Sequence, residues 1–156
     1  MERAVTQGSI RIRPLEARDA DALVEIQMES RESAQWPRES YEALAREEAP
    51  CFVAETGGRV VGFLSARKLA DEMEILNLAV ASAARRQGIG SQLLREAMRW
   101  GARNGISKAY LEVRASNAAA RQFYAVHGFW ATGVRAKYYR DPVDDAVLLT
   151  AAATSE

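Results

Sequence analysis

Two arginines and two glycines stand close together in the segment Arg85-Arg86-Gln87-Gly88-Ile89-Gly90. The segment follows an apolar run at 75–80 and precedes residues whose apolar positions recur with helical spacing, so we expect a strand, a tight turn and a helix. Glycine lets the backbone approach a ligand closely. The first N–H groups of a helix lack partners and carry partial positive charge. This combination predicts an anion site suited to a phosphate or pyrophosphate.

The segment differs from the two commonest phosphate-binding loops. It lacks the Lys-Ser/Thr ending of a P-loop, and its glycine spacing is not G-x-G-x-x-G. By itself, the hexapeptide is also compatible with an ordinary surface turn that is capped by glycine and carries two solvated arginines.

A second group of residues with possible chemistry follows downstream. Glu112 lies near the end of a predicted strand, Asn117 stands at the start of the next predicted helix, and Tyr124 lies within that helix. A carboxylate can accept a proton from an amine and a phenol can donate one. Each residue also has an ordinary structural explanation, as a solvent-facing strand residue, a helix cap and a helix core residue.

Length and charge limit the classes of function. The chain has 156 residues with 21 basic and 21 acidic side chains, which suits one domain at 1–156 and argues against broad nucleic-acid binding. It contains neither a signal-peptide pattern nor an apolar run near the ~20 residues of a membrane span. We therefore expect a cytoplasmic protein with no membrane partner. A monomer is the expectation, although the sequence leaves the oligomeric state open.

The single cysteine and the single histidine are both expected to be structural. One cysteine excludes an intramolecular disulfide and a cysteine-rich zinc site, and we expect no metal. Cys51 lies in a predicted buried strand, where an inert thiol is favoured. His127 precedes Gly128 at a predicted helix end and should interact with the helix dipole rather than take part in catalysis.

The remaining pattern predicts a mixed α/β domain. A short strand at 9–14 leads to a helix that begins at Asp19 and runs through Met28, and then to a loop at 30–40. Further elements are expected in this order: a helix at 40–48, strands at 51–56, 59–69 and 73–80, a helix from Gly90 to Asn104, a strand at 109–113, a helix at 117–126, and strands at 129–139 and 145–150. The sheet should be mostly antiparallel, with one parallel crossover over 73–113 and ligands near the carboxyl ends of its strands.

Two of these motifs resemble those of a known family. Arg85-x-x-Gly88-x-Gly90 is similar to the coenzyme A loop of the GCN5-related N-acetyltransferases (GNAT). The phrase Leu-Glu-Val-Arg-x-Ser-Asn-x-x-Ala at 111–120, followed by Tyr-x-x-x-Gly-Phe, resembles the RimI family of ribosomal protein S18 alanine N-acetyltransferases within that group. The resemblance is good over about 72–150 and weak before it. It implies a six- to seven-stranded sheet flanked by about four helices.

The resemblance also implies roles for individual residues, with acetyl-CoA as the co-substrate. Glu112 would be the general base and Tyr124 the general acid. The coenzyme would be held by backbone groups of one strand, by the glycine loop and by two residues of the following helix: Leu78, Ala79, Val80, Arg85, Arg86, Gln87, Gly88, Ile89, Gly90, Ser91, Asn117 and Tyr124. No metal or covalent enzyme intermediate is needed.

The implied reaction is direct acetyl transfer to a protein N-terminal amine, with the alanine of ribosomal protein S18 as the expected acceptor. An α-amine has a pKa near ~8 against ~10.4 for lysine, so a carboxylate acting through water can deprotonate it more easily. Trp36, Asn77, Tyr138 and Tyr139 could form a peptide groove; alternatively, Trp36 anchors a loop and the tyrosines pack on the sheet. Small amines, broader N-terminal specificity, and a non-catalytic acetyl-CoA sensor remain as alternatives.

Overall fold

The computed structural model describes residues 9–30 and 34–153, and it contains one seven-stranded sheet in the order β1-β2-β3-β4-β5-β7-β6. The elements follow the predicted sequence of strands and helices, with two added 3-10 turns. Their bounds are β1 Arg11–Pro14, η1 Ala17–Asp19, α2 Ala20–Met28, α3 Arg38–Ala45, β2 Phe52–Thr56, β3 Arg59–Leu69, β4 Glu72–Val80, η2 Ser82–Ala84, α4 Ile89–Arg103, β5 Lys108–Arg114, α5 Ala118–Val126, β6 Trp130–Arg140 and β7 Val143–Ala152.

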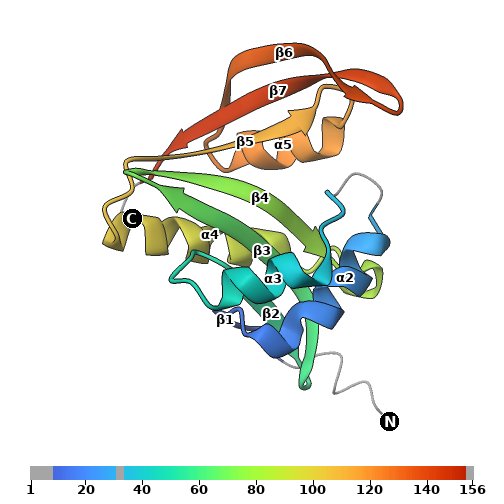
Figure 1. The fold of residues 1–156 in the computed structure, drawn as a ribbon, viewed down its shortest axis with the longest axis vertical. Helices are drawn as coiled ribbons and strands as arrows, with labels where there is room; N and C mark the ends of the chain where they lie inside the picture. The colour runs from blue at the N-terminus through green and yellow to red at the C-terminus, as the bar shows by residue number, and fades with distance from the viewer. Residues whose placement is uncertain (1–8, 31–33, 154–156) are drawn as a thin grey trace.

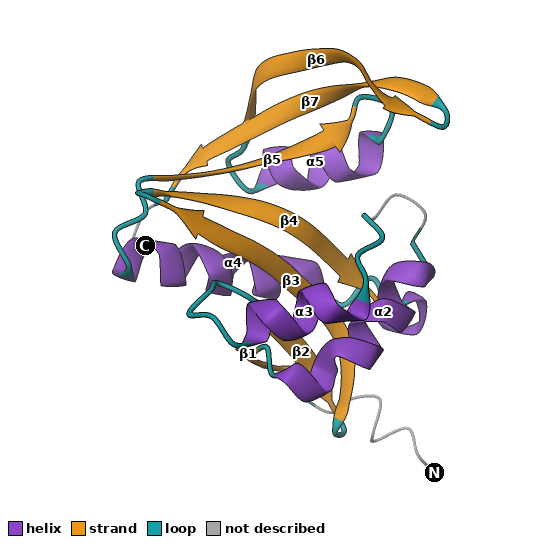
Figure 2. Ribbon diagram, in the orientation of Figure 1, coloured by secondary structure: helices purple, strands orange, loops and turns teal. Residues whose placement is uncertain are grey.

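Helices cover both faces of the sheet (Figures 1 and 2). The larger core joins α4 and α5 to one face through buried residues such as Leu93, Leu111 and Tyr124. A smaller core joins α2 and α3 to the other face, and it includes Leu23 and Phe63. This confirms the expected mixed, mostly antiparallel sheet with four helices.

The two central strands are paired over only part of their length. β4 and β5 form the parallel pair that was predicted, but only Glu72–Glu74 and Lys108–Tyr110 are in register. Beyond that point the strands spread apart, and Figure 1 shows them meeting at one end and diverging towards the other. Within the described ranges, the carboxyl-terminal half of β4 therefore has no strand partner on its β5 side.

A bulge in β4 decides which residues face each side of the sheet. Ser65 pairs with Asn77 while Ala66 pairs with Ile75, so Leu76 is an extra residue in β4. An extra residue reverses the alternation of side chains. Ile75 accordingly packs in the core beneath α4, whereas Ala79 packs in the core beneath α2 and α3.

The amino-terminal region differs from its predicted details. The first strand begins at Arg11 rather than at residue 9, and α3 begins at Arg38 and ends at Ala45 rather than covering 40–48. Part of the expected 30–40 loop, at 31–33, lies outside the described residues. Asp19 does precede α2, but its side chain makes no cap bond to that helix.

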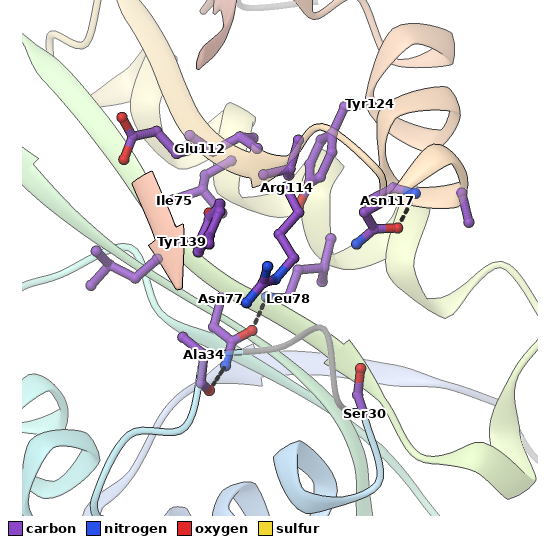
Figure 3. A pocket seen from close by; sticks show the side chains of 15 residues that line it. Ser30, Ala34, Ile75, Asn77, Leu78, Glu112, Arg114, Asn117, Tyr124 and Tyr139 are labelled. Atoms are coloured by element: carbon purple, nitrogen blue, oxygen red, sulfur yellow. Dashed lines mark hydrogen bonds between the residues drawn. The ribbon is translucent and has the colours of Figure 1, made fainter. Parts of the chain in front are cut away.

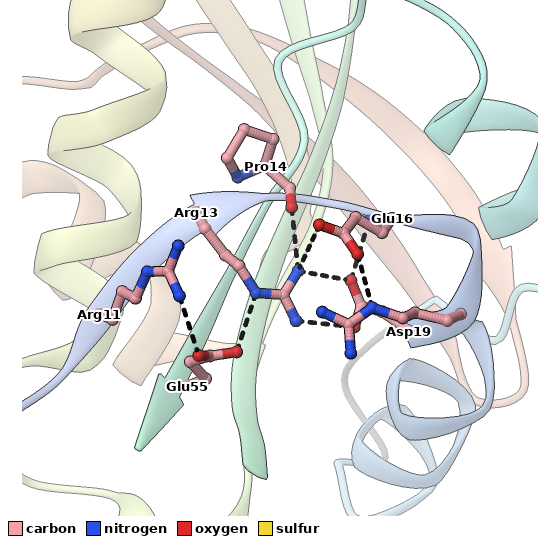
Figure 4. A network of polar contacts seen from close by, with 7 residues as sticks. Arg11, Arg13, Pro14, Glu16, Asp19 and Glu55 are labelled. Atoms are coloured by element: carbon pink, nitrogen blue, oxygen red, sulfur yellow. Dashed lines mark hydrogen bonds and ion pairs between the residues drawn. The ribbon is translucent and has the colours of Figure 1, made fainter. Parts of the chain in front are cut away.

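The Asp19 carboxylate instead joins a buried ionic network (Figure 4). Arg13 donates two hydrogen bonds of 2.9 Å to the two carboxylate oxygens of Asp19, and a third of 2.8 Å to Glu55 on β2. Arg13 and Asp19 are only 6% and 4% exposed. The network ties β1, η1 and β2 together because each charge is satisfied by a partner on another element.

Candidate active site

A continuous series of cavities runs from the glycine loop to the gap between β4 and β5. The first, of about 260 Å³, is lined by the loop and by Phe123. The next, of about 540 Å³, shares Val80, Arg85, Gly90 and Phe123 with it. The third, of about 550 Å³, shares Leu78, Ala120 and Tyr124 with the second and extends to Glu112 and Tyr139. The diverging strands therefore open a path through the sheet. Most of the sequence-predicted site residues lie along it, but Trp36, Ala79, Gln87 and Tyr138 do not.

The glycine loop has the backbone that the sequence predicts. Gly88 is the N-cap of α4 in the left-handed conformation (φ 76°), and Arg86 also has a positive φ of 68°. Gln92 is the first residue to bond back into the helix, to the Gly88 carbonyl. The N–H groups of Ile89, Gly90 and Ser91 precede this bond and are available to an anion.

The two arginines of the loop are exposed but not equivalent. Arg85 donates from Nε to the Val80 carbonyl over 3.0 Å, which folds the loop back onto the end of β4. Both arginines line the first cavity together with Gly88 and Ser91. The loop thus combines helical N–H groups with two full positive charges.

The open edge of β4 supplies backbone groups to the path. The Leu78 N–H is held by the side chain of Asn77 over 3.0 Å, and the Val80 carbonyl is held by Arg85. Ala81 donates to Val61 on β3. Since backbone groups alternate along a strand, Leu78 and Val80 face the gap, whereas Ala79 directs its own groups towards β3. Ala79 is therefore poorly placed for the backbone contact implied for it.

Glu112 lies on β5 and lines the third cavity (Figure 3). Arg135 of β6 places its Nε 2.5 Å from Glu112 Oε2. The two atoms form an ion pair but are not aligned for a hydrogen bond, and this buried oxygen receives no hydrogen bond from any described residue. Arg135 is 65% exposed, so it can move away more easily than a buried partner could.

Tyr124 and Asn117 border the same cavity from α5. Asn117 is the N-cap, as predicted, and its Oδ1 accepts from the Ala120 N–H over 3.1 Å. Figure 3 shows this bond, and the Asn117 amide nitrogen has no hydrogen-bond partner within the part of the chain that the structure describes. Tyr124 is 6% exposed, and its hydroxyl has no hydrogen-bond partner among the described residues. Burial raises the pKa of Tyr124 well above its ordinary value, so the phenol stays protonated.

Two side chains that the sequence left without a role, Arg114 and Phe123, also line the path. Arg114 lies over the Tyr139 ring at 4.3 Å and donates to the Pro142 carbonyl in the β6–β7 turn over 2.9 Å. It therefore holds Tyr139 and the hairpin over the cavity. Arg114 is part of the Glu-Val-Arg phrase, which was the signal for it, whereas Phe123 looks like an ordinary helix core residue.

The four residues predicted for a peptide groove separate into two pairs. Asn77 and Tyr139 line the third cavity, but Trp36 and Tyr138 do not. Trp36 packs against the smaller core, and Tyr138 is 50% exposed with its ring against Tyr139. The placement of Trp36 fits the alternative explanation, in which it anchors a loop.

A buried polar network holds that loop in place. The Gln27 amide donates to the Trp36 carbonyl over 2.6 Å and accepts from the Trp36 N–H over 3.2 Å. Tyr41 donates to Gln27 over 2.5 Å, and Asn77 donates to the Ala34 carbonyl over 3.1 Å. Ala34 itself lines the third cavity, so the network fixes one wall of the site.

The cysteine and the histidine have different surroundings. Cys51 is buried, and burial raises the pKa of its thiol to about 11, as suits an inert core residue. His127 is the C-cap of α5, but its imidazole contacts Ser91 over 2.9 Å. Burial first, and Arg95 second, lower the pKa of His127, which disfavours the cation that an interaction with the helix dipole would need.

Among the described residues, no group of three or more potential metal ligands lies close enough to hold an ion. Within 9–30 and 34–153, no helix is long and apolar enough to cross a bilayer.

The fold and the cavity define an acetyltransferase of the GNAT type. Residues 20–129 match the model of the "Acetyltransferase (GNAT) family", and the chain belongs to this family. It is accordingly an N-acetyltransferase, which confirms the class of enzyme expected from the sequence.

Individual relatives narrow the comparison. The chain is 30% identical over 140 residues to the [ribosomal protein bS18]-alanine N-acetyltransferase of Escherichia coli K12, which covers 88% of this chain and 94% of that protein. It is 39% identical over 97 residues to the N-alpha-acetyltransferase RimI of Mycobacterium tuberculosis, covering 60% of each chain. The crystal structure of the E. coli ribosomal-protein-S18-alanine N-acetyltransferase superposes with a TM-score of 0.85 at 28% identity, over 94% of this chain and 95% of that one.

Proposed function

We propose that this enzyme transfers an acetyl group from acetyl-CoA to the N-terminal amine of a protein. The observation that carries the proposal is the path from the α4 loop to Glu112. One end offers N–H groups and arginines to a pyrophosphate, and the other offers a carboxylate to an amine. The gap between β4 and β5 joins the two ends, so that a coenzyme and an acceptor amine bound at opposite ends can reach each other.

The chain has the features that an extended phosphorylated coenzyme needs. The left-handed Gly88 and the free N–H groups of α4 would hold the pyrophosphate. Leu78, Val80 and the Asn117 amide nitrogen would bond the pantetheine arm, once the Leu78 N–H is released from the Asn77 side chain. The bound coenzyme supplies the activated acetyl thioester.

Glu112 would act as the general base. An amine must lose a proton before it can attack, and an N-terminal amine with a pKa near ~8 needs only modest help at neutral pH. A carboxylate that acts through one water can accept that proton. The buried Glu112 oxygen without a hydrogen bond has capacity for such a water when the exposed Arg135 moves aside.

Tyr124 would donate a proton to the departing thiolate. Its hydroxyl reaches the cavity from α5, has no other partner among the described residues, and keeps its proton at neutral pH because burial raises its pKa. A thiolate formed beside Tyr124 is also less well solvated than in bulk water, so its proton affinity is raised too and the transfer is better matched than in water.

The acceptor that we favour is the N-terminal alanine of a ribosomal protein S18. This choice rests on the names of the relatives that match most of the chain, and on the Glu112–Asn117 phrase. A cytoplasmic location and a monomeric state remain predictions from the sequence.

Thiol release from acetyl-CoA against a panel of acceptors tests the proposal. The panel holds an S18-like N-terminal peptide, the same peptide with other first residues, a lysine peptide blocked at its N-terminus, and small amines. Turnover confined to free peptide N-termini with alanine first is the expected result. Turnover with small amines alone would show that the acceptor is a small amine and not a protein. Coenzyme binding without any turnover would indicate a sensor.

A further inference from the structure

The only histidine of the chain lies where α4 and α5 meet beside the glycine loop. Ser91 Oγ is 2.9 Å from His127 Nε2, and the imidazole ring lies 4.8 Å from the Phe123 ring. Phe123 covers Gly90, at which an added Cβ would lie 3.5 Å from the phenyl ring. Among the described residues, Ser91–His127 is the one side-chain hydrogen bond between α4 and the end of α5. His127 thus contacts Phe123 and Ser91, two residues that line the first cavity.

The tautomer and the protonation state of His127 together decide what Ser91 can offer to a ligand. Ser91 is the third residue of α4 and lines the first cavity. A serine hydroxyl has one proton to donate. If Nε2 of a neutral imidazole accepts that proton, only oxygen lone pairs are left for the cavity. If Nε2 carries a proton, as in the cation and in the other neutral tautomer, Nε2–H donates to Oγ and the hydroxyl proton is free for a phosphate oxygen. Only the cation adds a positive charge to that donor.

The surroundings favour the neutral form until an anion arrives. Burial has the largest effect and the charge of Arg95 adds to it, so the pKa of His127 lies below its usual value of 6.5. Ser91 and Arg95 face the ring from α4, and Phe123 faces it from α5. A phosphate near Ser91 would bring negative charge close to the ring and favour the cation.

We propose that His127 is a positioning residue of the coenzyme site, which acts through Ser91 so that a phosphate at the start of α4 binds together with a proton. This inference rests on the proposed use of acetyl-CoA. It assigns the histidine a task in binding, with no part in the transfer of the acetyl group.

The test measures binding of 3′-dephospho-coenzyme A to the tag-free protein as a function of pH. This probe lacks the terminal phosphate monoester, so its own phosphates do not titrate near neutral pH. We expect the affinity of the wild-type protein to rise roughly fivefold as the pH falls from about 7.5 to about 5.5, with net proton uptake in calorimetry. The one histidine ring can be followed by NMR without assignment, and its titration should move to higher pH when the probe binds.

Two variants separate this role from a structural one. His127→Gln places an amide that can donate to Ser91 at every pH, so its affinity should be independent of pH. Ser91→Ala keeps the imidazole but removes the hydroxyl, and we expect a weaker pH dependence there as well. Three results would each overturn this inference and leave the proposed function standing. They are an affinity of the wild-type protein that does not change with pH, an unchanged pH dependence in His127→Gln, and an imidazole titration that does not shift when the probe binds. No binding at any pH would overturn the proposed coenzyme site with it.

Discussion

At the scale of single residues, Glu112 and Tyr124 approach the cavity from different elements and in different states. Glu112 on β5 is paired with the exposed Arg135, while Tyr124 on α5 has a raised pKa and a hydroxyl with no partner among the described residues. Because their surroundings differ, their variants should fail at different steps. Each of the two roles can therefore be tested separately.

For Glu112→Gln we expect turnover at neutral pH to fall by ~10²-fold, with little change in acetyl-CoA affinity, because the amide cannot accept a proton. Steady-state turnover and coenzyme binding by calorimetry provide the measurements. Glu74→Gln is a matched control, since that carboxylate is bonded to Arg67 outside the cavity and its loss should leave turnover nearly unchanged. A fully active Glu112→Gln variant would exclude the general-base role.

For Tyr124→Phe we expect a single-turnover rate that is roughly 10- to 100-fold slower in a protein with the same fold, because only the proton donor is removed. Rapid-quench measurement with saturating coenzyme isolates this step. Tyr110→Phe, on β5 away from the cavity, should behave like the wild-type enzyme. If the Tyr124 variant shows an unchanged rate, the leaving thiolate takes its proton from another group.

At the scale of elements, the site depends on how α2, α3 and β4 hold the segment around Trp36. Gln27, Tyr41 and Asn77 come from these three elements and are only 3%, 1% and 7% exposed. Each bonds with another member or with the segment itself. Buried polar groups that lose a partner cost about 1–3 kcal/mol each, so the network gives the acceptor wall a single position.

Gln27→Leu keeps the size of the side chain but removes both bonds to Trp36. We expect the KM for a peptide acceptor to rise about tenfold, while the dissociation constant of acetyl-CoA stays the same, because only the acceptor wall is loosened. Tyr41→Phe removes the hydroxyl that bonds to Gln27 and Asn77 but keeps both bonds between Gln27 and Trp36, so it should show a smaller change in the same direction. An equal loss of acceptor and coenzyme binding in Gln27→Leu would point to general unfolding instead.

At the scale of the whole molecule, the buried Arg13–Asp19–Glu55 network fastens the first strand to the rest of the sheet. Burial alone would raise the pKa of Asp19. The hydrogen bonds and charge of Arg13 and the Glu16 N–H outweigh this effect and lower it below the ordinary value of 3.8. A lowered carboxylate pKa contributes stability above the ordinary pKa, and this stability is lost as the pH falls through the folded-state pKa.

We therefore expect thermal stability to fall as the pH drops below about 4, and Asp19→Asn to lose most of this dependence. Melting temperatures measured from neutral pH down to strongly acidic pH test this expectation. Asp21→Asn is the control, because that carboxylate is 74% exposed in its pair with Arg38 and should change the profile little. If Asp19→Asn kept the full acid dependence, other carboxylates would have to cause it.

Removing the Arg13 guanidinium should lower the stability of the protein more than neutralising the Asp19 carboxylate does. Arg13→Met leaves Asp19 buried without its partner, and we expect a loss of about 3 kcal/mol in the free energy of unfolding. Denaturant titration of both variants provides the comparison. Equal stability of Arg13→Met and the wild-type protein would show that water replaces the guanidinium.

Local patterns in the sequence determined most of the elements and the chemistry at their ends. The order of strands and helices, the helix start at the glycine loop and the Asn117 cap all depend on neighbouring residues, so a linear pattern contains them. The membership of the GNAT family was also readable from motifs of this kind. Boundaries near Pro37 and Asp19 were less certain because tertiary partners compete there with local preferences.

Only the tertiary structure decided how these residues meet. The bulge at Leu76 turns Ala79 towards the second core, and the divergence of β4 from β5 opens the cavity. Arg135 against Glu112, Arg114 over Tyr139, and His127 against Ser91 are contacts between residues at least 23 positions apart. Such contacts depend on strand register and helix packing over the whole sheet, and no short stretch of sequence specifies either of these.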